Sequence, residues 1–273
     1  MTAVAFQSIA VNRLGLAEPG DTAIERDVPI EVPVALEYCG IGYAVMMASP
    51  DHLEDFIIGH AVAEGLVASA TDVMAVDIAQ IDGGWVARAQ LPEGARDAIF
   101  ARARTRVSDS SCGLCGVDSI AEALRALPQV TSRINISRAA IASALAGLKD
   151  LQPLNAKTGA VHGAAFCNSD GGIVCVREDV GRHNALDKLI GALSRDDKDM
   201  TKGFVLLTAR CSFELVEKTV RSGAPALVTI SAPTSLATLR AKSAGLTLLA
   251  LARRDSVLVI HDPHAIEKQG TQL

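Results

Sequence analysis

The sequence is poor in aromatic residues, which make up only 3% of its 273 residues, although hydrophobic residues make up 49%. Its core must therefore be built mainly from Ala, Val, Leu and Ile side chains. The chain also lacks an excess of positive charge, because its formal net charge is −5 and its sequence pI is near 5.7. A general nucleic-acid-binding face needs a basic surface, so this composition disfavours that class of function and leaves room only for a local basic pocket.

No apolar window approaches the length of about twenty residues that a membrane span needs. Residues 1–20 also lack a basic region followed by a long apolar run, so we expect no secretory signal and a cytoplasmic protein. In a reducing compartment, structural disulfides among the six cysteines are not expected. Cys167, Cys175 and Cys211 lie in or beside strand-like runs and are predicted to pack in the core as small hydrophobic side chains.

The N-terminal part of the sequence predicts two β-hairpins. Apolar and polar residues alternate over residues 31–48 around a turn at 39–42, and over residues 76–91 around a turn at 82–84. No catalytic constellation is recognisable in this part of the chain. We interpret residues 1–107 as a smaller α+β lobe.

A helix is predicted between the two hairpins. Ser49 is expected to be its N-cap and Pro50 its first residue, while Asp51 and Glu54 lie where the helix dipole stabilises carboxylates. His60 belongs to the apolar stripe of this helix. We therefore predict a core histidine with a hydrogen-bond partner rather than a metal ligand.

The second half of the chain alternates strands with helices, which predicts an α/β fold with right-handed parallel crossovers in a central sheet. The predicted strands cover residues 159–167, 173–176, 204–209, 226–230, 246–251 and 257–260, and the predicted helices cover 184–193, 213–222 and 235–244. In such sheets, ligands bind beyond the carboxyl ends of the strands.

Two turns that follow predicted strands combine hydroxyl groups with the start of a helix. They are Arg210-Cys211-Ser212 and Ser231-Ala232-Pro233-Thr234-Ser235. Capping of the helices by Ser212 and Ser235 accounts for these residue types. The free N–H groups of a helix N-terminus also bind phosphate groups. Capping and phosphate binding are compatible, and at this point both stay open.

Residues 177–188 form the densest polar run of the sequence. Asn184, Asp187 and Lys188 share one face of the predicted helix at positions i, i+3 and i+4. A solvated face has a similar pattern, but Arg, His, Asn, Asp and Lys around a glycine differ from the Glu and Lys of a solubilising face. We interpret this run as a binding surface.

Cys112 and Cys115 stand three positions apart in the glycine-flanked segment SSCGLCG. Only a thiolate acts as a nucleophile or metal ligand, and with a pKa of roughly 8.5 a free thiol is little ionised near neutral pH. Ser119 and Glu122 have capping-box spacing, so a helix predicted just after Cys115 would place its positive end near the thiols. Few apolar residues anchor residues 108–116, and we expect a mobile, accessible loop there.

Several chemistries use two thiols at this spacing. A structural zinc site is disfavoured because it needs about four ligands, and the sequence has no second C-x-x-C and no H-x-x-x-H. A zinc deaminase needs an H-x-E motif followed by a cysteine pair, whereas His162 is followed by Ala164 in the glutamate position and the cysteine pair lies upstream. Dithiol redox exchange and sulfur carriage as a persulfide both stay open.

These motifs together resemble the FdhD family of sulfurtransferases, which mature formate dehydrogenase. The resemblance extends over nearly the whole chain, including residues 31–34, 51–56 and 64–65, and its most specific parts are residues 111–116, 158–162, 177–188 and 231–235. It implies a protein that accepts sulfur as a persulfide from a cysteine desulfurase. The sulfur is then passed to the molybdenum bis(guanine dinucleotide) cofactor before that cofactor enters formate dehydrogenase.

The resemblance also implies roles for individual residues. Cys112 is implied to be the persulfide carrier and Cys115 its helper, with no catalytic metal. The implied cofactor contacts, which bind guanine nucleotide, map onto Leu251, Ala252, Arg253, Arg254, Asp255 and Ser256. The implied partners are the desulfurase, the catalytic subunit of formate dehydrogenase and a second copy in a homodimer. Nucleic acid and membrane are not expected as partners.

The implied fold is a cytidine-deaminase-like three-layer core over residues 117–273, joined to the N-terminal lobe through the CxxC loop at 108–116. Phosphate groups of the nucleotide are expected near the Ser212 or Thr234 turn, supported by the arginines at 253 and 254. An alternative from a different class is a chaperone that only holds the cofactor, or a dithiol redox protein without sulfur transfer.

Overall fold

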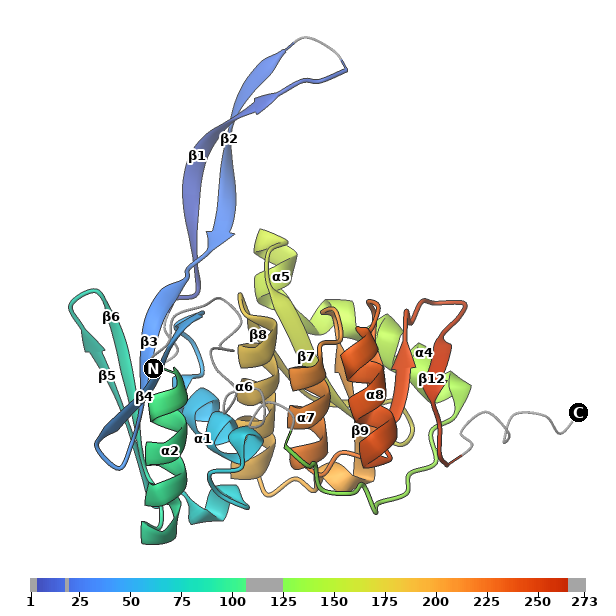
Figure 1. Cartoon of the computed structure of the whole chain (residues 1–273). Helices are drawn as coiled ribbons and strands as arrows, with labels where there is room; N and C mark the ends of the chain where they lie inside the picture. Colours follow the sequence, from blue (N-terminus) through green and yellow to red (C-terminus); the bar gives the residue numbers. More distant parts are fainter. Residues whose placement is uncertain (1–3, 18–19, 107–124, 265–273) are drawn as a thin grey trace, which may run out of the picture.

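The computed structural model describes residues 4–17, 20–106 and 125–264. In this part the chain forms a mixed α/β fold with a two-stranded, a four-stranded and a six-stranded sheet (Figure 1). None of the helices within these residues is long and apolar enough to cross a membrane. Short 3-10 helices lie at η1 (Ala70–Asp72), η2 (Glu93–Ala95), η3 (Lys149–Leu151) and η4 (Met200–Lys202).

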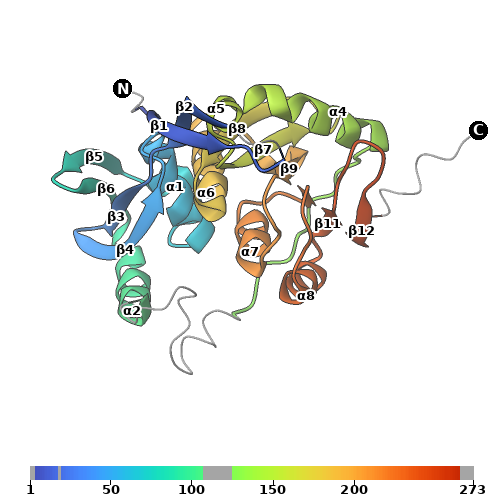
Figure 2. The same cartoon turned by 90° about the horizontal axis from the view of Figure 1, so that it is seen from above.

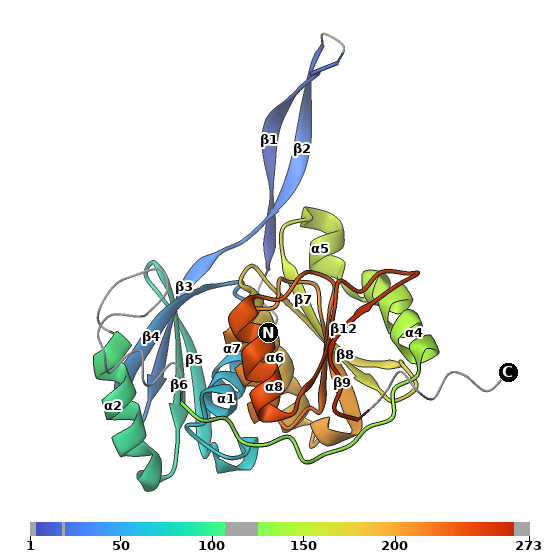
Figure 3. The ribbon, with the colours of Figure 1, turned by 45° about the vertical axis from the view of Figure 1, so that its right-hand side comes forward.

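The two-stranded sheet is a hairpin that extends away from the rest of the molecule, as Figures 1 and 3 both show. Strand β1 (Phe6–Leu14) pairs along its whole length with β2 (Asp21–Pro29) in antiparallel orientation. Near the base of the hairpin, the guanidinium of Arg26 donates to the carbonyl of Thr158 at 2.7 Å. Thr158 is the last residue of α5 (Pro153–Thr158), so α5 holds the base of the hairpin.

Both predicted hairpins of the N-terminal part are confirmed, and together they form the four-stranded sheet with the order β4-β3-β6-β5. The strands are β3 (Val32–Tyr38), β4 (Ile41–Ala48), β5 (Ala75–Ile81) and β6 (Gly84–Gln90). Cys39 and Gly40 join β3 to β4 with φ angles of 53° and 77°. Two successive positive φ angles are what a two-residue type I′ turn requires.

The helix between these hairpins, α1 (Leu53–Glu64), begins three residues later than predicted. Ser49 is not its N-cap. The N–H of Ser49 donates instead to the Asp179 carboxylate at 3.0 Å, and its hydroxyl accepts from the N–H of Val180 at 3.2 Å. His52 occupies the N-cap position with a φ of 52° and makes no side-chain capping bond. Contacts with a distant strand therefore override the local capping preference of Ser49.

Helix α1 packs its side chains against the four-stranded sheet, and α2 (Arg96–Arg106) lies beside β4. The prediction for His60 is confirmed, because its side chain is buried and its Nδ1 atom lies 2.8 Å from the hydroxyl of Tyr38. Phe56 and Ile57 are fully buried in the same cluster. This part of the chain therefore has its own apolar core.

The six-stranded sheet has the order β12-β11-β10-β9-β7-β8. Its strands are β7 (His162–Asn168), β8 (Ile173–Asp179), β9 (Gly203–Leu207), β10 (Ala226–Thr229), β11 (Thr247–Ala250) and β12 (Leu258–His261). All six predicted strands are confirmed within a few residues. Strands β9, β10 and β11 are parallel, but β7, β8 and β12 run antiparallel to their neighbours. The sheet is mixed because the short β7–β8 and β11–β12 connections cannot make parallel crossovers.

Helices cover both faces of this sheet (Figure 2). The three predicted helices are confirmed as α6 (Arg182–Arg195), α7 (Phe213–Arg221) and α8 (Ser235–Ala244), and a further helix is α4 (Arg138–Leu148). Val205 and Leu207 of β9 pack in one apolar cluster with α6, α7 and α8. Phe204 and Leu206, on the opposite side of the same strand, pack with α4. The alternation along β9 thus separates the two helical layers.

Helices α1 and α6 cross at very short distance. A Cβ atom on Gly59 of α1 would lie 1.7 Å from the carbonyl oxygen of Asp187, and one on Gly191 of α6 would lie 1.9 Å from the carbonyl oxygen of Asp55. Neither position has room for a side chain. This close crossing joins the four-stranded sheet and its helix to the six-stranded sheet.

Candidate functional site

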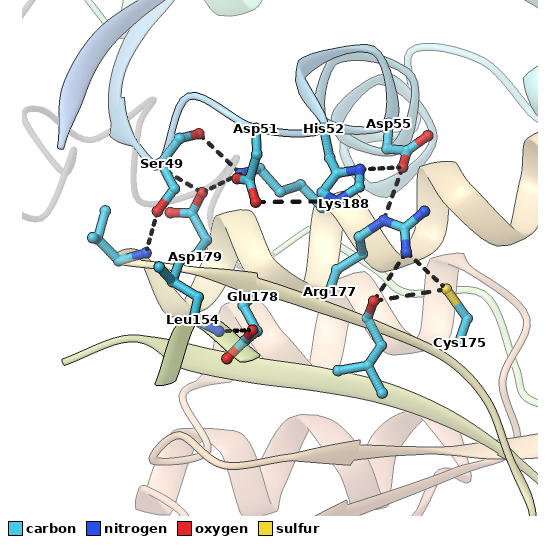
Figure 4. A network of polar contacts seen from close by, with 12 residues as sticks. Ser49, Asp51, His52, Asp55, Leu154, Cys175, Arg177, Glu178, Asp179 and Lys188 are labelled. Carbon is cyan, nitrogen blue, oxygen red and sulfur yellow. Dashed lines mark hydrogen bonds and ion pairs between the residues drawn. The ribbon is translucent and has the colours of Figure 1, made fainter. Parts of the chain in front are cut away.

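The polar face of α6 is buried, which corrects its interpretation as a binding surface. The ammonium of Lys188 is fully buried and donates to the Ser49 carbonyl at 2.9 Å, while its charge pairs with Asp51 at 2.9 Å and Asp179 at 2.7 Å (Figure 4). The amide of Asn184 donates to the same Asp179 carboxylate at 3.0 Å. Burial raises the pKa of Asp179, and the neighbouring Lys188 opposes that shift. These residues join α6 to the segment before α1.

A second part of this network lies at the other side of α1. Asp55 of α1 is buried and accepts from Arg177 at 2.9 Å and from Arg195 at 2.7 Å. Arg177 also donates to the Sγ atom of Cys175 at 3.3 Å (Figure 4). Burial raises the pKa of the Cys175 thiol, and the nearby guanidinium only partly opposes this. These charges hold α1 against β8 and α6.

The C-terminal end of α1 carries another buried cluster. Lys218 bonds both carboxylate oxygens of Asp187, at 2.8 and 2.9 Å, and pairs with Glu64 at 3.4 Å. Burial raises the pKa of Asp187 to about 6, although Lys218 opposes the shift. The Glu64 carbonyl accepts from Arg102 at 2.8 Å and from Arg125 at 2.9 Å. Arg102 and Arg125, which lie on either side of residues 107–124 in the sequence, are therefore both bonded to the C-terminal end of α1.

Three polar side chains meet at the N-termini of α6 and α7. Nε2 of His183 lies 3.2 Å from the Ser212 hydroxyl and 3.0 Å from the Glu214 carboxylate. Burial would raise the pKa of Glu214, but the hydrogen bond and charge of His183 together with Ser212 and Lys218 outweigh it and lower that pKa. Because both partners use the same nitrogen, this group cannot relay a proton as a serine–histidine–carboxylate triad does. Among the residues that the structure describes, no group of three or more His, Cys, Asp or Glu side chains is placed to hold a metal ion.

The two predicted helix caps differ from expectation. Ser212 is at the N-cap position of α7 but makes no capping bond, since its hydroxyl faces His183. For α8 the N-cap is Thr234 rather than Ser235, and the Thr234 hydroxyl accepts from the N–H of Ala237 at 3.2 Å. Neither turn lines the pocket described next.

A pocket of about 420 Å³ lies between α4 and the β11–β12 edge of the sheet. Its lining combines an apolar floor with a charged rim. The floor includes Ile141, Leu145, Leu249, Val257 and Val259, and the rim includes Arg138, Arg253, Arg254, Asp255, Ser256 and Asp262. Ligand sites typically have this volume and this combination of apolar walls with a few convergent polar groups.

The structure brings four of the six predicted cofactor contacts to this pocket, namely Arg253, Arg254, Asp255 and Ser256. Leu251 and Ala252 do not line it. Ala252 is buried in the cluster under α4, and Leu251 has a φ of 50°, a left-handed conformation that non-glycine residues rarely adopt. The chain thus turns sharply after β11, and residues 253–256 lie on the pocket rim.

The arginines of the pocket differ in the hydrogen bonds that they make within the protein. The guanidinium of Arg253 donates to the carbonyls of Ile230 and, at 2.9 Å, Ala252. Within the described part of the chain, Arg254 is exposed and its guanidinium makes no hydrogen bond or ion pair. Arg138 comes from α4, which is remote in sequence, and no sequence motif marks it. Only the packing of α4 against β11 could reveal it.

The cysteines fall into two groups. Cys112 and Cys115, the predicted persulfide carrier and helper, lie outside the described residues, as does the helix predicted after them. The described cysteines are free thiols, and Cys167 and Cys211 are buried as predicted, whereas Cys175 is half-buried. Burial raises the pKa of Cys167 and of Cys211 to about 12. Cys39 is engaged with the backbone of Leu91, whose N–H lies 3.4 Å from its sulfur.

The model of the FdhD/NarQ family matches residues 29–267, which are most of this chain. The chain belongs to the FdhD/NarQ family. The resemblance seen in the sequence motifs is therefore confirmed. The match begins at the last residue of β2, so the protruding hairpin lies almost entirely outside the matched region.

Individual relatives of the FdhD/NarQ family agree with this assignment. A protein of Variovorax paradoxus named sulfur carrier protein FdhD is 43% identical over 236 residues, which are 86% of this chain and 85% of the relative. A protein of Agrobacterium fabrum with the same name is 43% identical over 244 residues, which are 89% and 90% of the two chains.

A solved structure has the same fold. The crystal structure of a protein from Desulfotalea psychrophila, described as a formate dehydrogenase accessory protein, matches with a TM-score of 0.75 at 23% identity. The match covers 96% of this chain and 99% of that one. The mixed α/β arrangement of several sheets is thus shared across the length of both chains.

Proposed function

We propose that this protein is a sulfur carrier for the maturation of formate dehydrogenase. In this proposal Cys112 accepts sulfur as a persulfide from a cysteine desulfurase, and Cys115 assists its release. The acceptor is the molybdenum bis(guanine dinucleotide) cofactor, which is bound as a substrate before it enters the catalytic subunit of formate dehydrogenase. Family membership and the names of the relatives support sulfur carriage.

The observation that carries the proposal is the state of the other four cysteines. A sulfur carrier needs an accessible thiolate. Cys167 and Cys211 are buried and have pKa values of about 12, so they are protonated at neutral pH. Burial also raises the pKa of Cys175, and Cys39 is engaged with the backbone of Leu91. Cys112 and Cys115 are the two cysteines left for exchange.

The proposed transfer conserves atoms and electrons. The Cys112 thiolate attacks the terminal sulfur of the desulfurase persulfide, and the desulfurase cysteine leaves as a thiolate. Attack of the Cys115 thiolate on the Cys112 sulfur then forms a disulfide and releases the carried sulfur as hydrosulfide to the cofactor. A thiol reductant must reduce this disulfide before the next cycle.

We propose that the pocket beside α4 binds the guanine nucleotide portion of the cofactor. The arginines at 138 and 254 offer charge-assisted donors to phosphate oxygens, and the apolar floor suits the face of a base. Asp255 and Asp262 would repel phosphate, but their carboxylates accept the N–H donors on the edge of guanine. In this proposal the phosphates bind at the arginine side of the rim rather than at the Ser212 or Thr234 turn.

We also propose the cytidine-deaminase-like assignment for the six-stranded sheet and its helices. The strand order β12-β11-β10-β9-β7-β8 and the helices on both faces support it. The division into a lobe at residues 1–107, a loop at 108–116 and a core at 117–273 stays a prediction. Because α1 of the lobe and α6 of the core cross closely, the lobe and the core are in contact wherever the boundary between them is drawn.

Mass spectrometry after incubation with a cysteine desulfurase and cysteine tests the proposed carrier. We expect one added sulfur on the peptide that contains Cys112, removable by a thiol reductant, and none on the peptides of Cys167, Cys175 or Cys211. The physical reason is that burial keeps these three thiols protonated. Sulfur found mainly on one of the three would overturn the assignment.

Replacement of Arg254 by alanine is expected to weaken GDP binding roughly tenfold or more, because each charge-assisted bond contributes on the order of 1.5 to 3 kcal/mol. Arg254 is a cleaner target than Arg253, whose guanidinium also holds backbone carbonyls. Calorimetry at fixed salt measures the affinity. Arg210→Ala is the matched variant, since Arg210 is an exposed arginine beside the Ser212 turn. Loss of affinity in Arg210→Ala with Arg254→Ala unchanged would move the phosphates to that turn.

A further inference from the structure

The first turn of α6 lies at one edge of the six-stranded sheet, beside the start of β7. Strand β8 ends at Asp179, and α6 begins at Arg182. His162, the first residue of β7, is the antiparallel partner of Asp179. Because β7 also runs antiparallel to β9, its start lies at the carboxyl end of β9. His162, Arg182 and His183 are therefore together at the edge of the sheet where α/β proteins bind ligands.

These three side chains form a basic cluster that contains nitrogen atoms without a partner. The Nε atom of Arg182 is buried and has no hydrogen-bond partner. Across the described part of the chain, the rest of its guanidinium and the imidazole of His162 make no hydrogen bond or ion pair. A buried guanidinium nitrogen is a donor only, so it needs an acceptor. No protein group in the described residues supplies that acceptor, whereas an oxyanion would.

The positive charge of the basic cluster is not balanced within the described residues. Two carboxylates lie beside the cluster, and both are already paired. Asp179 pairs with Lys188 at 2.7 Å, and Glu214 pairs with His183 at 3.0 Å. The charge of Arg182 remains without a counterion in this part of the chain. An anion is thus the ligand class that this place favours.

His162 is sensitive to the charge around it. Burial lowers the pKa of its imidazole, and the positive charges of Arg182 and His183 lower it further, although Asp179 opposes them. The ring is therefore uncharged at neutral pH and donates one N–H group. An anion bound beside the ring would stabilise the protonated form and raise this pKa. The titration of His162 is thus a direct probe of the cluster.

Two helix starts add backbone donors to the basic cluster. Helix α6 begins after Gly181, which has no side chain to cap it. Helix α7 begins after Ser212, which makes no capping bond because its hydroxyl faces His183. The N–H groups in the first turn of a helix carry partial positive charge and bind anions when no side chain caps them. Both helices therefore favour the same ligand class as the side chains.

The basic cluster and the pocket beside α4 lie on the same edge of the sheet. Residues 253–256 of the pocket rim follow β11, which is parallel to β10 as β10 is to β9. In the order β11-β10-β9-β7, the two places are three strand spacings apart, which is about 14 Å. Arg253 extends along this edge, because its guanidinium donates to the carbonyl of Ile230 just beyond β10. A cofactor whose nucleotide fills the pocket can follow the edge to the cluster.

We propose that the basic cluster binds the oxygen ligands at the metal end of the cofactor, while the pocket beside α4 binds its guanine nucleotide. The identity of this ligand rests on the proposed function, whereas the anion site rests on the contacts of Arg182, His162 and His183. Metal-bound oxo groups carry negative charge and accept hydrogen bonds, which the cluster donates. Phosphate oxygens have the same chemistry, so the experiment must distinguish the two.

Titration of His162 by proton NMR tests the anion site, with inorganic sulfate as a probe that stays a dianion where histidine titrates. Sulfate should raise the pKa of His162 in the wild type at constant ionic strength. In Arg182→Met the pKa without sulfate should be higher than in the wild type, because the charge of Arg182 lowers it. Sulfate should then have little further effect. His162→Gln identifies the resonance by its disappearance.

Calorimetry with inorganic molybdate at mildly alkaline pH measures the affinity for a metal-oxo anion. Arg182→Met should weaken this binding roughly tenfold or more, since it removes a charge-assisted donor. Arg182→Lys keeps the charge and should keep part of the affinity. Arg133→Met is the matched control and should bind as the wild type does, because Arg133 is an exposed arginine without a hydrogen bond or ion pair in the described chain.

Measurements of the proposed function separate the two sites. Arg182→Met should bind GDP with the wild-type affinity and should still carry sulfur on Cys112. Arg254→Ala should lose GDP affinity but keep the sulfate response of His162. A wild-type protein that binds no GDP while His162 still responds to sulfate would contradict the proposed pocket and the identity of the ligand, but not the anion site.

Three outcomes would overturn the proposal. One is a wild-type His162 pKa that sulfate leaves unchanged, a measurement that needs no variant to fold. Another is molybdate binding that is equally strong in Arg182→Met and in the wild type. The third is a His162 response to GDP as large as the response to sulfate, because phosphate groups of the nucleotide would then occupy the basic cluster. Thermal unfolding verifies that each variant is folded.

Discussion

Replacement of Cys112 by alanine is expected to reduce sulfur delivery to background while leaving GDP affinity unchanged. The variant removes the thiolate that is proposed to accept the sulfane sulfur, and the buried Cys167 and Cys211 cannot substitute because their pKa values are about 12. Within the described residues, the proposed nucleotide pocket is lined by α4, β11 and the residues after it. Formate dehydrogenase activity in cells that depend on this protein measures delivery, and calorimetry with GDP measures binding.

Two further variants make this result specific. Cys115→Ala is expected to retain persulfide formation and to lose delivery, since attack by Cys115 releases the sulfur in the proposed transfer. Cys175→Ala is the control and should behave as the wild type, because that thiol lies against Arg177 in the α1 contact and plays no part in the proposed transfer. Full formate dehydrogenase activity in Cys112→Ala would favour the chaperone alternative. Loss of both activity and GDP binding would indicate a folding defect.

Replacement of Lys188 by methionine is expected to lower the free energy of unfolding by about 3 to 5 kcal/mol, the usual cost of leaving one partner of a buried ion pair uncompensated. The ammonium is fully buried and pairs with Asp179 and Asp51. Methionine fills a similar volume, so the lost charge dominates the effect. Urea denaturation measures it, with Lys202→Met as the exposed control, for which a change within about 0.5 kcal/mol is expected.

The loss of unfolding free energy in Lys188→Met should depend on pH in one direction. Burial already raises the pKa of Asp179, and loss of the lysine removes the main group that opposes the shift. A carboxyl with a raised pKa binds its proton more readily in the folded than in the unfolded chain. The destabilisation that its buried charge causes therefore falls as the pH falls through that pKa. The deficit of Lys188→Met should therefore shrink in acid, and Asp179→Asn in the same chain should restore part of the stability. A deficit that grows in acid would contradict the role of Asp179.

Several elements of the fold could be predicted because their signals are local. Alternation over residues 31–48 and 76–91 sets which side of each hairpin faces the core, and turn residues such as Gly40 supply the positive φ angle that the connection needs. The predicted helix at 235–244 agrees with α8 to the residue, since its apolar periodicity and the Gly245 that ends it are neighbours in sequence.

Predictions failed where the partner of a residue is distant in the chain. Asn184, Asp187 and Lys188 have the same pattern on a solvated face, a binding face or a buried ion-pair contact, because residue type and spacing are identical in all three. Only the position of Ser49 and Asp51 over α6 decides between them. Ser49 has the residue type of a cap for α1, but its bond to Asp179 changes the start of that helix.

The sequence by itself determined the local elements, the six cysteines and the motifs that place the chain in its family. The tertiary structure alone decided which polar residues are buried, since burial depends on what packs over a side chain. It also joined Arg138 to the residues after β11 in one pocket, and left the outer edge of β1 unpaired in the described chain. Pockets and free edges arise from the relative placement of elements that are far apart in sequence, so no local pattern specifies them.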